Sequence, residues 1–204
     1  RQVARRLAEG GFLVIVPTLI DRTSAQRMGG ATMTSREFLH RPAFVMGRPL
    51  IGYEVQKVLA LVDWLAAGSP APRIGVFGYG EGGGVALFAA ALDDRIDAAG
   101  VSGWFDDRND VWRQPLDRNV FGLLDQFGDA ELASMVAPRP LVIEAAAAPE
   151  FVFEPGQGGA PGRIATPRLE TVQAEAARAR ELVRGLEPAP ALVVVAAGED
   201  GRGA

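Results

Sequence analysis

The segment from Arg73 to Leu87 constrains the fold of this chain more than any other. Its apolar run Ile74–Phe77 predicts a buried strand. Five glycines follow between positions 78 and 84, and Val85–Leu92 is apolar on every side. This pattern predicts a tight turn and then a buried helix. Turns of this kind lie at the carboxyl edge of parallel sheets, where α/β proteins place their functional groups, so the type of turn decides the function.

One interpretation of the glycines is the dinucleotide-binding pattern G-x-G-x-x-G, which Gly78, Gly80 and Gly83 match. Glycines in this pattern let a pyrophosphate approach the backbone at a helix N-terminus. The pattern also requires an acidic residue roughly 20 residues further on, at the end of the next strand. The strand expected at 96–102 ends in Ser-Gly-Trp instead, and Asp106 comes too late. A dinucleotide-binding oxidoreductase domain therefore stays the least favoured hypothesis.

The second interpretation is the nucleophile elbow G-x-S-x-G of serine hydrolases. The residues Gly78-Tyr79-Gly80-Glu81-Gly82 fit this frame, but Gly80 takes the place of the serine. A serine at this position is held in a strained conformation that costs on the order of 1–3 kcal/mol, which glycine avoids. Glycine has no side chain, however, and cannot form an acyl-enzyme. Taken alone, the frame also fits a tight turn without any chemistry.

The surrounding segments favour the elbow. The chain resembles the α/β-hydrolase superfamily, in particular bacterial esterases of the acetyl xylan esterase and dienelactone hydrolase type. Besides the elbow, three segments resemble parts of that fold in the same order: Gly52 to Leu65 as the helix before the elbow strand, Ala90 to Ala99 as the helix exit and next strand, and Ala137 to Glu144 as the entry to the following strand.

The alternation of apolar runs predicts an α/β fold, a three-layer α/β/α sandwich with a mostly parallel sheet, as a single domain over residues 1–204. The expected strands are 12–16, 74–77, 96–102, 141–144 and 191–195, and the expected helices are 1–9, 53–66, 85–92, 129–136 and one that begins at 166–167. Residues 18–50, 104–128 and 149–165 are expected to be irregular.

The resemblance implies that these strands correspond to the fourth through eighth strands of an eight-stranded sheet. The core is then expected to be incomplete at both ends, with the third strand upstream of Arg1 and the final helix beyond Ala204. Since the third strand lies between the fourth and fifth in that family, we expect 12–16 to lie one strand-width too far from 74–77 or to pair with it non-natively.

Composition narrows the classes of partner. The 204 residues carry a net charge of −4 without a basic block, which argues against nucleic acid. There are no cysteines, so thiolate nucleophiles and thiolate metal sites are excluded. No apolar run approaches the roughly 20 residues needed to span a bilayer. We expect no cofactor, metal, nucleic acid or membrane partner, and a small ester or sugar-like ligand is the candidate partner.

The resemblance assigns roles to the catalytic positions. The N–H of Glu81 would be one oxyanion donor, although its carboxylate would repel an oxyanion. The alternative for Glu81 is a solvated or arginine-paired carboxylate at a helix N-terminus. The triad acid should follow 141–144, where Glu150 comes one residue late, and Asp106 occupies a second acid position used in some hydrolases. Either acid could equally be a surface group.

The triad histidine should follow the last strand, but residues 196–201 contain none. The chain has one histidine, His40, which lies before the elbow and outside the family's position. It is expected to be a solvated or structural residue in a loop. The triad is therefore missing at two of its three positions.

Several polar and aromatic residues would gather at the carboxyl edge of the sheet. Arg22, Tyr79 and Arg108 are candidate substrate-binding residues there, with Trp104 and Trp112 as apolar walls. The alternative is a set of surface salt bridges and a packed aromatic flap.

Two functional hypotheses follow besides dinucleotide binding. The first is an esterase-like protein that has lost serine chemistry and serves as a binding or scaffold domain. The second is a hydrolase in which Glu81, Glu150 or Asp106 activates water as a general base.

Overall fold

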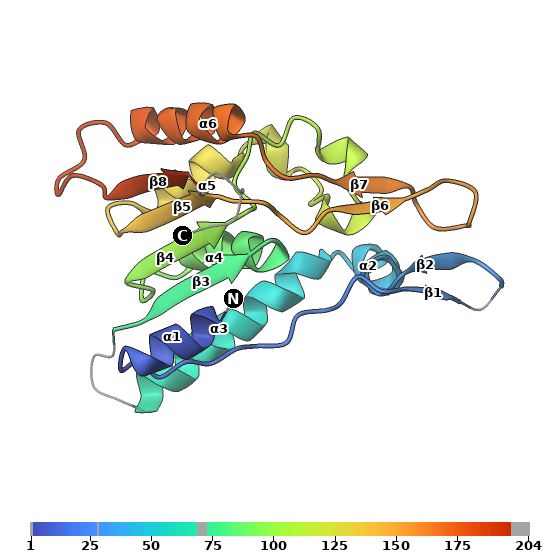
Figure 1. Cartoon of the computed structure of the whole chain (residues 1–204), viewed down its shortest axis with the longest axis horizontal. Helices are drawn as coiled ribbons and strands as arrows, with labels where there is room; N and C mark the ends of the chain where they lie inside the picture. Colours follow the sequence, from blue (N-terminus) through green and yellow to red (C-terminus); the bar gives the residue numbers. More distant parts are fainter. Residues whose placement is uncertain (1, 28, 69–72, 197–204) are drawn as a thin grey trace.

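A computed structural model of the chain describes residues 2–27, 29–68 and 73–196 (Figure 1). Its helices are α1 Val3–Glu9, α2 Ser35–Val45, α3 Leu50–Gly68, α4 Glu81–Leu92, α5 Asp129–Val136 and α6 Leu169–Leu182, with 3-10 turns η1 Val111–Arg113, η2 Leu116–Arg118 and η3 Leu123–Asp125. Its strands are β1 Ser24–Gln26, β2 Thr32–Thr34, β3 Gly75–Tyr79, β4 Ala98–Ser102, β5 Leu141–Ala145, β6 Phe151–Phe153, β7 Gly162–Ile164 and β8 Leu192–Ala196.

A parallel sheet with strand order β3-β4-β5-β8 forms the centre (Figure 1). The register aligns the carboxyl ends of the strands, because Tyr79 pairs with Ser102, Ser102 with Glu144 and Glu144 with Val195. The helices α4, α5 and α6 connect successive strands, as parallel pairing requires. This confirms the predicted α/β class, in the form of an α/β-hydrolase-like sandwich.

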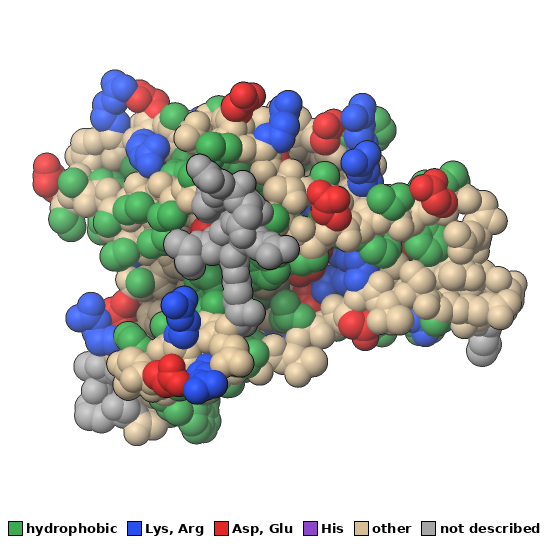
Figure 2. All heavy atoms as spheres, in the orientation of Figure 1, with side chains coloured by type: hydrophobic (Ala, Val, Ile, Leu, Met, Phe, Trp, Pro, Cys, Tyr) green, Lys and Arg blue, Asp and Glu red, His purple; other side chains and the backbone are tan. Residues whose placement is uncertain are grey.

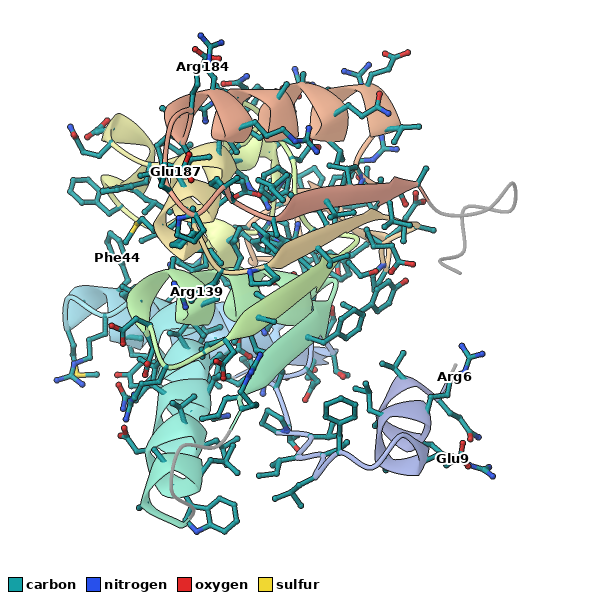
Figure 3. All side chains as sticks on the ribbon, turned by 90° about the vertical axis from the view of Figure 1, so that its left-hand side faces the viewer. Arg6, Glu9, Phe44, Arg139, Arg184 and Glu187 are labelled. Carbon is teal, nitrogen blue, oxygen red and sulfur yellow. The ribbon has the colours of Figure 1, made fainter. Side chains whose placement is uncertain are left out.

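Apolar packing concentrates between the sheet and α4. The side chains of Leu87, Val101 and Ile143 are fully buried there, and α4 is apolar on all sides as the sequence predicted. Arg139 closes the far end of this helix, since its guanidinium donates to the carbonyl oxygens of Ala90 at 2.7 Å and Asp93 at 2.8 Å (Figure 3). A cation at a helix C-terminus also interacts favourably with the helix dipole.

The opposite face of the sheet carries one exposed apolar row. Phe77, Gly100, Val142 and Val193 face one another across the four strands, and the side chains of Phe77, Val142 and Val193 are exposed. Figure 2 shows hydrophobic side chains gathered over this region. None of the helices in the described ranges covers this row: α1 lies beyond β3 in Figure 1 and contains no buried residue.

The prediction of a strand at 12–16 is wrong. This segment is extended but pairs with no strand, and Phe12, Leu13 and Val16 are 65, 75 and 72% exposed. A strand needs a neighbour that satisfies its backbone groups, and β3 is hydrogen-bonded on one side to β4 alone among the described strands. Direct pairing of 12–16 with β3 is therefore not observed.

Two segments expected to be irregular contain short regular elements. Residues 18–50 include the β1–β2 hairpin and α2, and residues 149–165 include the β6–β7 hairpin. Their strands have three residues each, too few to show a period. The helix α2 did have a signal, the capping pattern Thr34-Ser35-Arg36-Glu37, and the Thr34 hydroxyl accepts from the Glu37 N–H at 3.0 Å. The three 3-10 turns agree with the irregular structure expected at 104–128.

The remaining expected elements are confirmed within a few residues at their ends. These are the helices near 1–9, 53–66, 85–92, 129–136 and 166–186 and the strands near 74–77, 96–102, 141–144 and 191–195. No helix in the described parts of the chain combines the length and apolar character needed to cross a bilayer.

The turn after β3 yields a first prediction. A β-carbon at Gly78 would lie 1.8 Å from the carbonyl oxygen of Gly82, which is backbone and cannot swing away. We expect Gly78→Ala to lower the free energy of unfolding by about 3 kcal/mol or more, measured by urea denaturation. The matched control is Gly82→Ala, where an added β-carbon meets only a Leu19 methyl at 3.8 Å and alanine favours the helix. Equal stabilities of the two variants would contradict this account of the turn.

Candidate functional site

The turn between β3 and α4 has the geometry of an elbow. Gly80 joins the two elements with φ +55° and ψ −123°, a conformation that glycine adopts without a steric cost. Its N–H donates to the Ser102 carbonyl oxygen at 2.9 Å, and its own carbonyl oxygen accepts from the Gly83 N–H at 2.8 Å. The backbone is therefore sharply bent at the position where a hydrolase carries its nucleophile.

The space above Gly80 is occupied by Pro149. A β-carbon added at Gly80 would lie 3.0 Å from Pro149 Cδ and 3.3 Å from Cγ. Pro149 belongs to the segment after β5, where the resemblance places the triad acid. A side chain at position 80 would therefore require the proline ring to move by a few tenths of an ångström.

The carboxylate of Glu81 is held by arginines. Its Oε1 accepts from Arg22 Nη2 and from Arg118 Nε, both at 2.8 Å, and forms an ion pair with Arg118 Nη2 at 2.7 Å. This is the arginine-paired alternative expected for a helix N-terminus. In such an arrangement the carboxylate is a structural anchor for the first turn of α4.

The same arginines extend into a buried ion-pair network. Arg36 is almost fully buried and donates to Glu54 Oε2 at 2.8 Å and to Asp117 Oδ2 at 2.7 Å. Asp117 also accepts from both Nη1 and Nη2 of Arg22, at 2.6 and 2.8 Å. Three arginines and three carboxylates thus neutralise one another, and Figure 2 shows basic and acidic side chains together between the sheet and the paired hairpins. We call these residues the arginine–carboxylate network: Arg22, Arg36, Glu54, Glu81, Asp117 and Arg118.

Ion pairing sets the proton affinities in this network. Burial alone would raise the pKa of Asp117, but the hydrogen bonds and charges of Arg22 and Arg36 outweigh it and lower the pKa. The pKa of Glu81 is lowered in the same way, since Arg118 and Arg22 outweigh its desolvation. A lowered pKa makes Glu81 a weaker base than an ordinary glutamate.

Trp104 and Arg108 lie together beside the first turn of α4. The guanidinium of Arg108 stacks 4.2 Å from the Trp104 ring centroid and pairs with buried Asp129 at 2.6 Å. The ring fills the space beside Gly84, where a β-carbon would lie 2.5 Å from Trp104 Cε2. Burial raises the pKa of Asp129. The donors of Arg108 are therefore engaged with protein groups, apart from Nη1, which makes no hydrogen bond to a described residue.

The other expected binding residues do not converge with these two. Trp112 is exposed and stacks with its neighbour Arg113, whose guanidinium lies 4.6 Å from the ring centroid. Tyr79 is half-exposed and its hydroxyl donates to the Ala147 carbonyl oxygen at 2.7 Å. Arg22 belongs to the arginine–carboxylate network. Their roles as substrate-binding residues stay predictions.

The two candidate acids differ in their surroundings. Glu150 is exposed directly after Pro149, and its one described partner is the Thr166 hydroxyl at 3.4 Å. Asp106 is partly buried and its Oδ1 accepts from the Asp107 N–H at 2.9 Å. The structure thus leaves the Glu150 carboxylate available to solvent.

His40 was expected in a loop, but it lies in α2, where it is almost fully buried. Its ring lies 5.7 Å from that of Phe44, and its Nδ1 has no partner among the described residues. Burial lowers the pKa of His40. The position expected for a triad histidine, 196–201, lies outside the described residues except for Ala196.

Sequence reasoning missed four groups around the elbow. They are Arg36 and Asp117, which pair with each other, Arg118, which pairs with Glu81, and Pro149, which covers Gly80. Their sequence signals are weak, because the partners lie 18–95 residues apart along the chain. Among the described residues, no group of three or more His, Asp or Glu side chains could hold a metal ion.

Breaking the network should cost far more than breaking a surface ion pair. We expect Asp117→Asn to lower the free energy of unfolding by about 3–5 kcal/mol, because two buried arginines lose part of their compensation. The matched control is Glu181→Gln, which removes the exposed pair with Arg184 and should cost at most about 0.5 kcal/mol. Chemical denaturation measures both, and comparable losses would contradict the importance assigned to the network.

Acid should destabilise the fold in a defined pH range. Asp117 and Glu81 have folded-state pKa values below their ordinary 3.8 and 4.5, and a hydrogen bond from Arg178 lowers the pKa of Glu131 to about 2. Their stabilising contributions are complete above the unfolded-state values and are lost as pH falls through the folded-state values. We expect the free energy of unfolding to fall between pH 4.5 and about 2, and Glu131→Gln to make this fall shallower.

Comparison with known proteins identifies the fold and the family. A model of the dienelactone hydrolase family matches residues 1–106, just over half of the chain and including the elbow. The Bacillus subtilis (strain 168) protein named "Putative hydrolase YtaP" is 30% identical over 110 residues, which are 50% of this chain and 37% of that protein. A Bacteroides fragilis structure described as a "putative acetyl xylan esterase" superposes with a TM-score of 0.58 and 12% identity, over 82% of this chain and 42% of that chain.

The chain thus spans less than half the length of either relative. The structural likeness establishes the α/β-hydrolase fold, and the sequence match over the elbow region establishes the family. This chain belongs to the dienelactone hydrolase family.

Proposed function

We propose that this chain is a ligand-binding member of its family in which serine-based ester hydrolysis does not operate. The observation that carries the proposal is Gly80, which stands at the nucleophile position with an elbow backbone and no side chain. Acyl transfer on this fold requires a nucleophilic oxygen or sulfur at that point. The ligand class follows from the esterase relatives, and we take it to be a small ester or a sugar-like molecule.

Ser102, the hydroxyl on the neighbouring strand, does not replace the missing serine. Ser102 lies one strand away, but it is 2% exposed and donates to Glu144 Oε2 at 2.5 Å. The chain has no cysteine. The packing of Pro149 against Gly80 further favours a site without a nucleophile, because it occupies the space that a serine side chain would need.

A second candidate function is hydrolysis by carboxylate-activated water. Of the three candidate bases, Glu81 is weakened by its arginines. Glu150 is favoured by its exposure and its place directly after Pro149. In this alternative Glu150 would remove a proton from the water that attacks the ester carbonyl.

We expect the full-length protein to hydrolyse p-nitrophenyl acetate no faster than buffer, because Gly80 supplies no nucleophile. Release of p-nitrophenolate, followed by absorbance, measures this rate. Turnover by the unmodified protein would contradict the proposal. If Glu150→Gln then abolished that turnover while Asp106→Asn did not, the second candidate function would replace the first.

Restoring the serine tests what else the site lacks. We expect Gly80→Ser combined with Pro149→Ala, which makes room for the new side chain, to stay at background. The physical reason is the missing base, since the one histidine in the chain is buried in α2. Ester turnover by this double variant would show that a base lies within reach of position 80. The lack of a nucleophile at Gly80 would then be the reason why the unmodified protein does not hydrolyse esters.

A further inference from the structure

The helix α2 is amphipathic in the inverse sense. A surface helix usually buries its apolar side and exposes its polar side. In α2 the buried side carries Arg36, Glu37 and His40 together with Ala43. Arg36 belongs to the arginine–carboxylate network, and Glu37 accepts from the Ala160 N–H at 2.9 Å. The polar groups of α2 are therefore held inside the fold, and its apolar side faces solvent.

The end of α2 carries the most exposed part of this apolar side. Phe44, Val45 and Met46 are 51, 86 and 66% exposed. Arg48 follows in the connection to α3, and its exposed side chain forms no ion pair or hydrogen bond with a described residue. We call Phe44, Val45, Met46 and Arg48 the α2 patch.

A second exposed apolar patch surrounds η3. Phe121, Leu124 and Phe127 are 87, 47 and 39% exposed. Asp125 stands between them in the chain and is exposed, and its carboxylate has no ion-pair or hydrogen-bond partner among the described residues. We call Phe121, Leu124, Asp125 and Phe127 the η3 patch.

Both patches adjoin the start of α3. Ile51, in the first turn of α3, lines the same small cavity as Leu124 and Phe127, and the α2 patch leads directly into that turn. The helix α2 also packs against η2, which precedes the η3 patch in the chain. In Figure 3 Phe44 lies on the opposite side of the molecule from Arg6 of α1. Large exposed apolar patches of this kind mark interaction sites.

The charges of the two patches favour a second copy of this chain as the occupant. The α2 patch has a cation, and no acidic residue occurs between Phe38 and Tyr53, whereas the η3 patch has a carboxylate. When two copies meet about a twofold axis, the α2 patch of each can face the η3 patch of the other, and every contact then occurs twice. Arg48 pairs with Asp125 of the second copy in this arrangement. An anionic lipid surface is a poorer occupant, because it would repel Asp125.

We propose that this protein forms a symmetric dimer in which the α2 patch of each copy contacts the η3 patch of the other. Both patches of each copy are buried at once, so both contribute to the roughly 800 Å² per partner that a stable interface buries. The apolar side chains form the centre of each contact, and Arg48 and Asp125 fix its register. Gly80 takes no part, so this inference does not depend on the proposed ligand binding.

The test is the mass of the full-length protein in solution, measured by analytical ultracentrifugation over a series of concentrations. We expect a reversible dimer whose Kd rises at least tenfold in Arg48→Glu and in Asp125→Arg, because each variant places like charges opposite each other twice. We expect the double variant Arg48→Glu/Asp125→Arg to recover the original Kd to within about threefold, because the attraction returns with its signs exchanged. The matched control is Arg6→Glu, which makes the same charge change on the opposite side of the molecule and should leave the Kd unchanged (Figure 3).

A full-length protein that stays monomeric would overturn the dimer, and this is the result expected if another part of the same polypeptide covers the patches. A dimer that resists both charge reversals, or that the double variant does not restore, would overturn the assigned face. Val45→Ser tests the apolar contact without a change of charge. We expect it to raise the Kd at least fivefold, and Val16→Ser, at another exposed valine, to leave the Kd unchanged. Equal dissociation constants of these two variants would also overturn the assigned face.

Discussion

The region around the elbow depends on one buried guanidinium, that of Arg36. It forms ion pairs with Glu54 on α3 and with Asp117 on η2. Arg22 in turn pairs with Asp117 and with Glu81 at the start of α4. Removing charges from water costs several kcal/mol per ion, which is recovered only when each charge has good partners. Because the partners come from segments far apart along the chain, the network stabilises their arrangement as a unit rather than any single helix.

The elbow conformation persists without the side chain that it usually presents. Contacts within the turn explain this, since the close approach of Gly78 to the Gly82 carbonyl and the hydrogen bond from Gly80 to Ser102 hold the bend. The nearby charges are equally independent of catalysis, because they are paired with one another. The absence of a side chain at Gly80 therefore leaves the surrounding architecture intact, which is compatible with the binding function that we propose.

The long periodic elements could be predicted from the sequence, and the short or partner-dependent ones could not. The helices α3 and α5 and the strands β4 and β5 follow from apolar runs of the right length. The segment 12–16 has an equally apolar run but no strand beside it, so its pattern alone was misleading. For the site, the elbow and its missing serine could be predicted. Pro149 above Gly80 and the acceptor-free indole of Trp104 could not, because both are properties of packing.

The amino-acid sequence by itself determined the α/β class, the position of the elbow and the absence of a side chain at Gly80, since these follow from local patterns of residue type. The tertiary structure decided which charges neutralise one another and where a donor is left without a partner. From the sequence, Arg22 and Arg108 were expected to bind a ligand. In the folded chain Arg22 forms an ion pair with Asp117, and Arg108 forms one with Asp129. Long-range pairing depends on distances that no local pattern encodes.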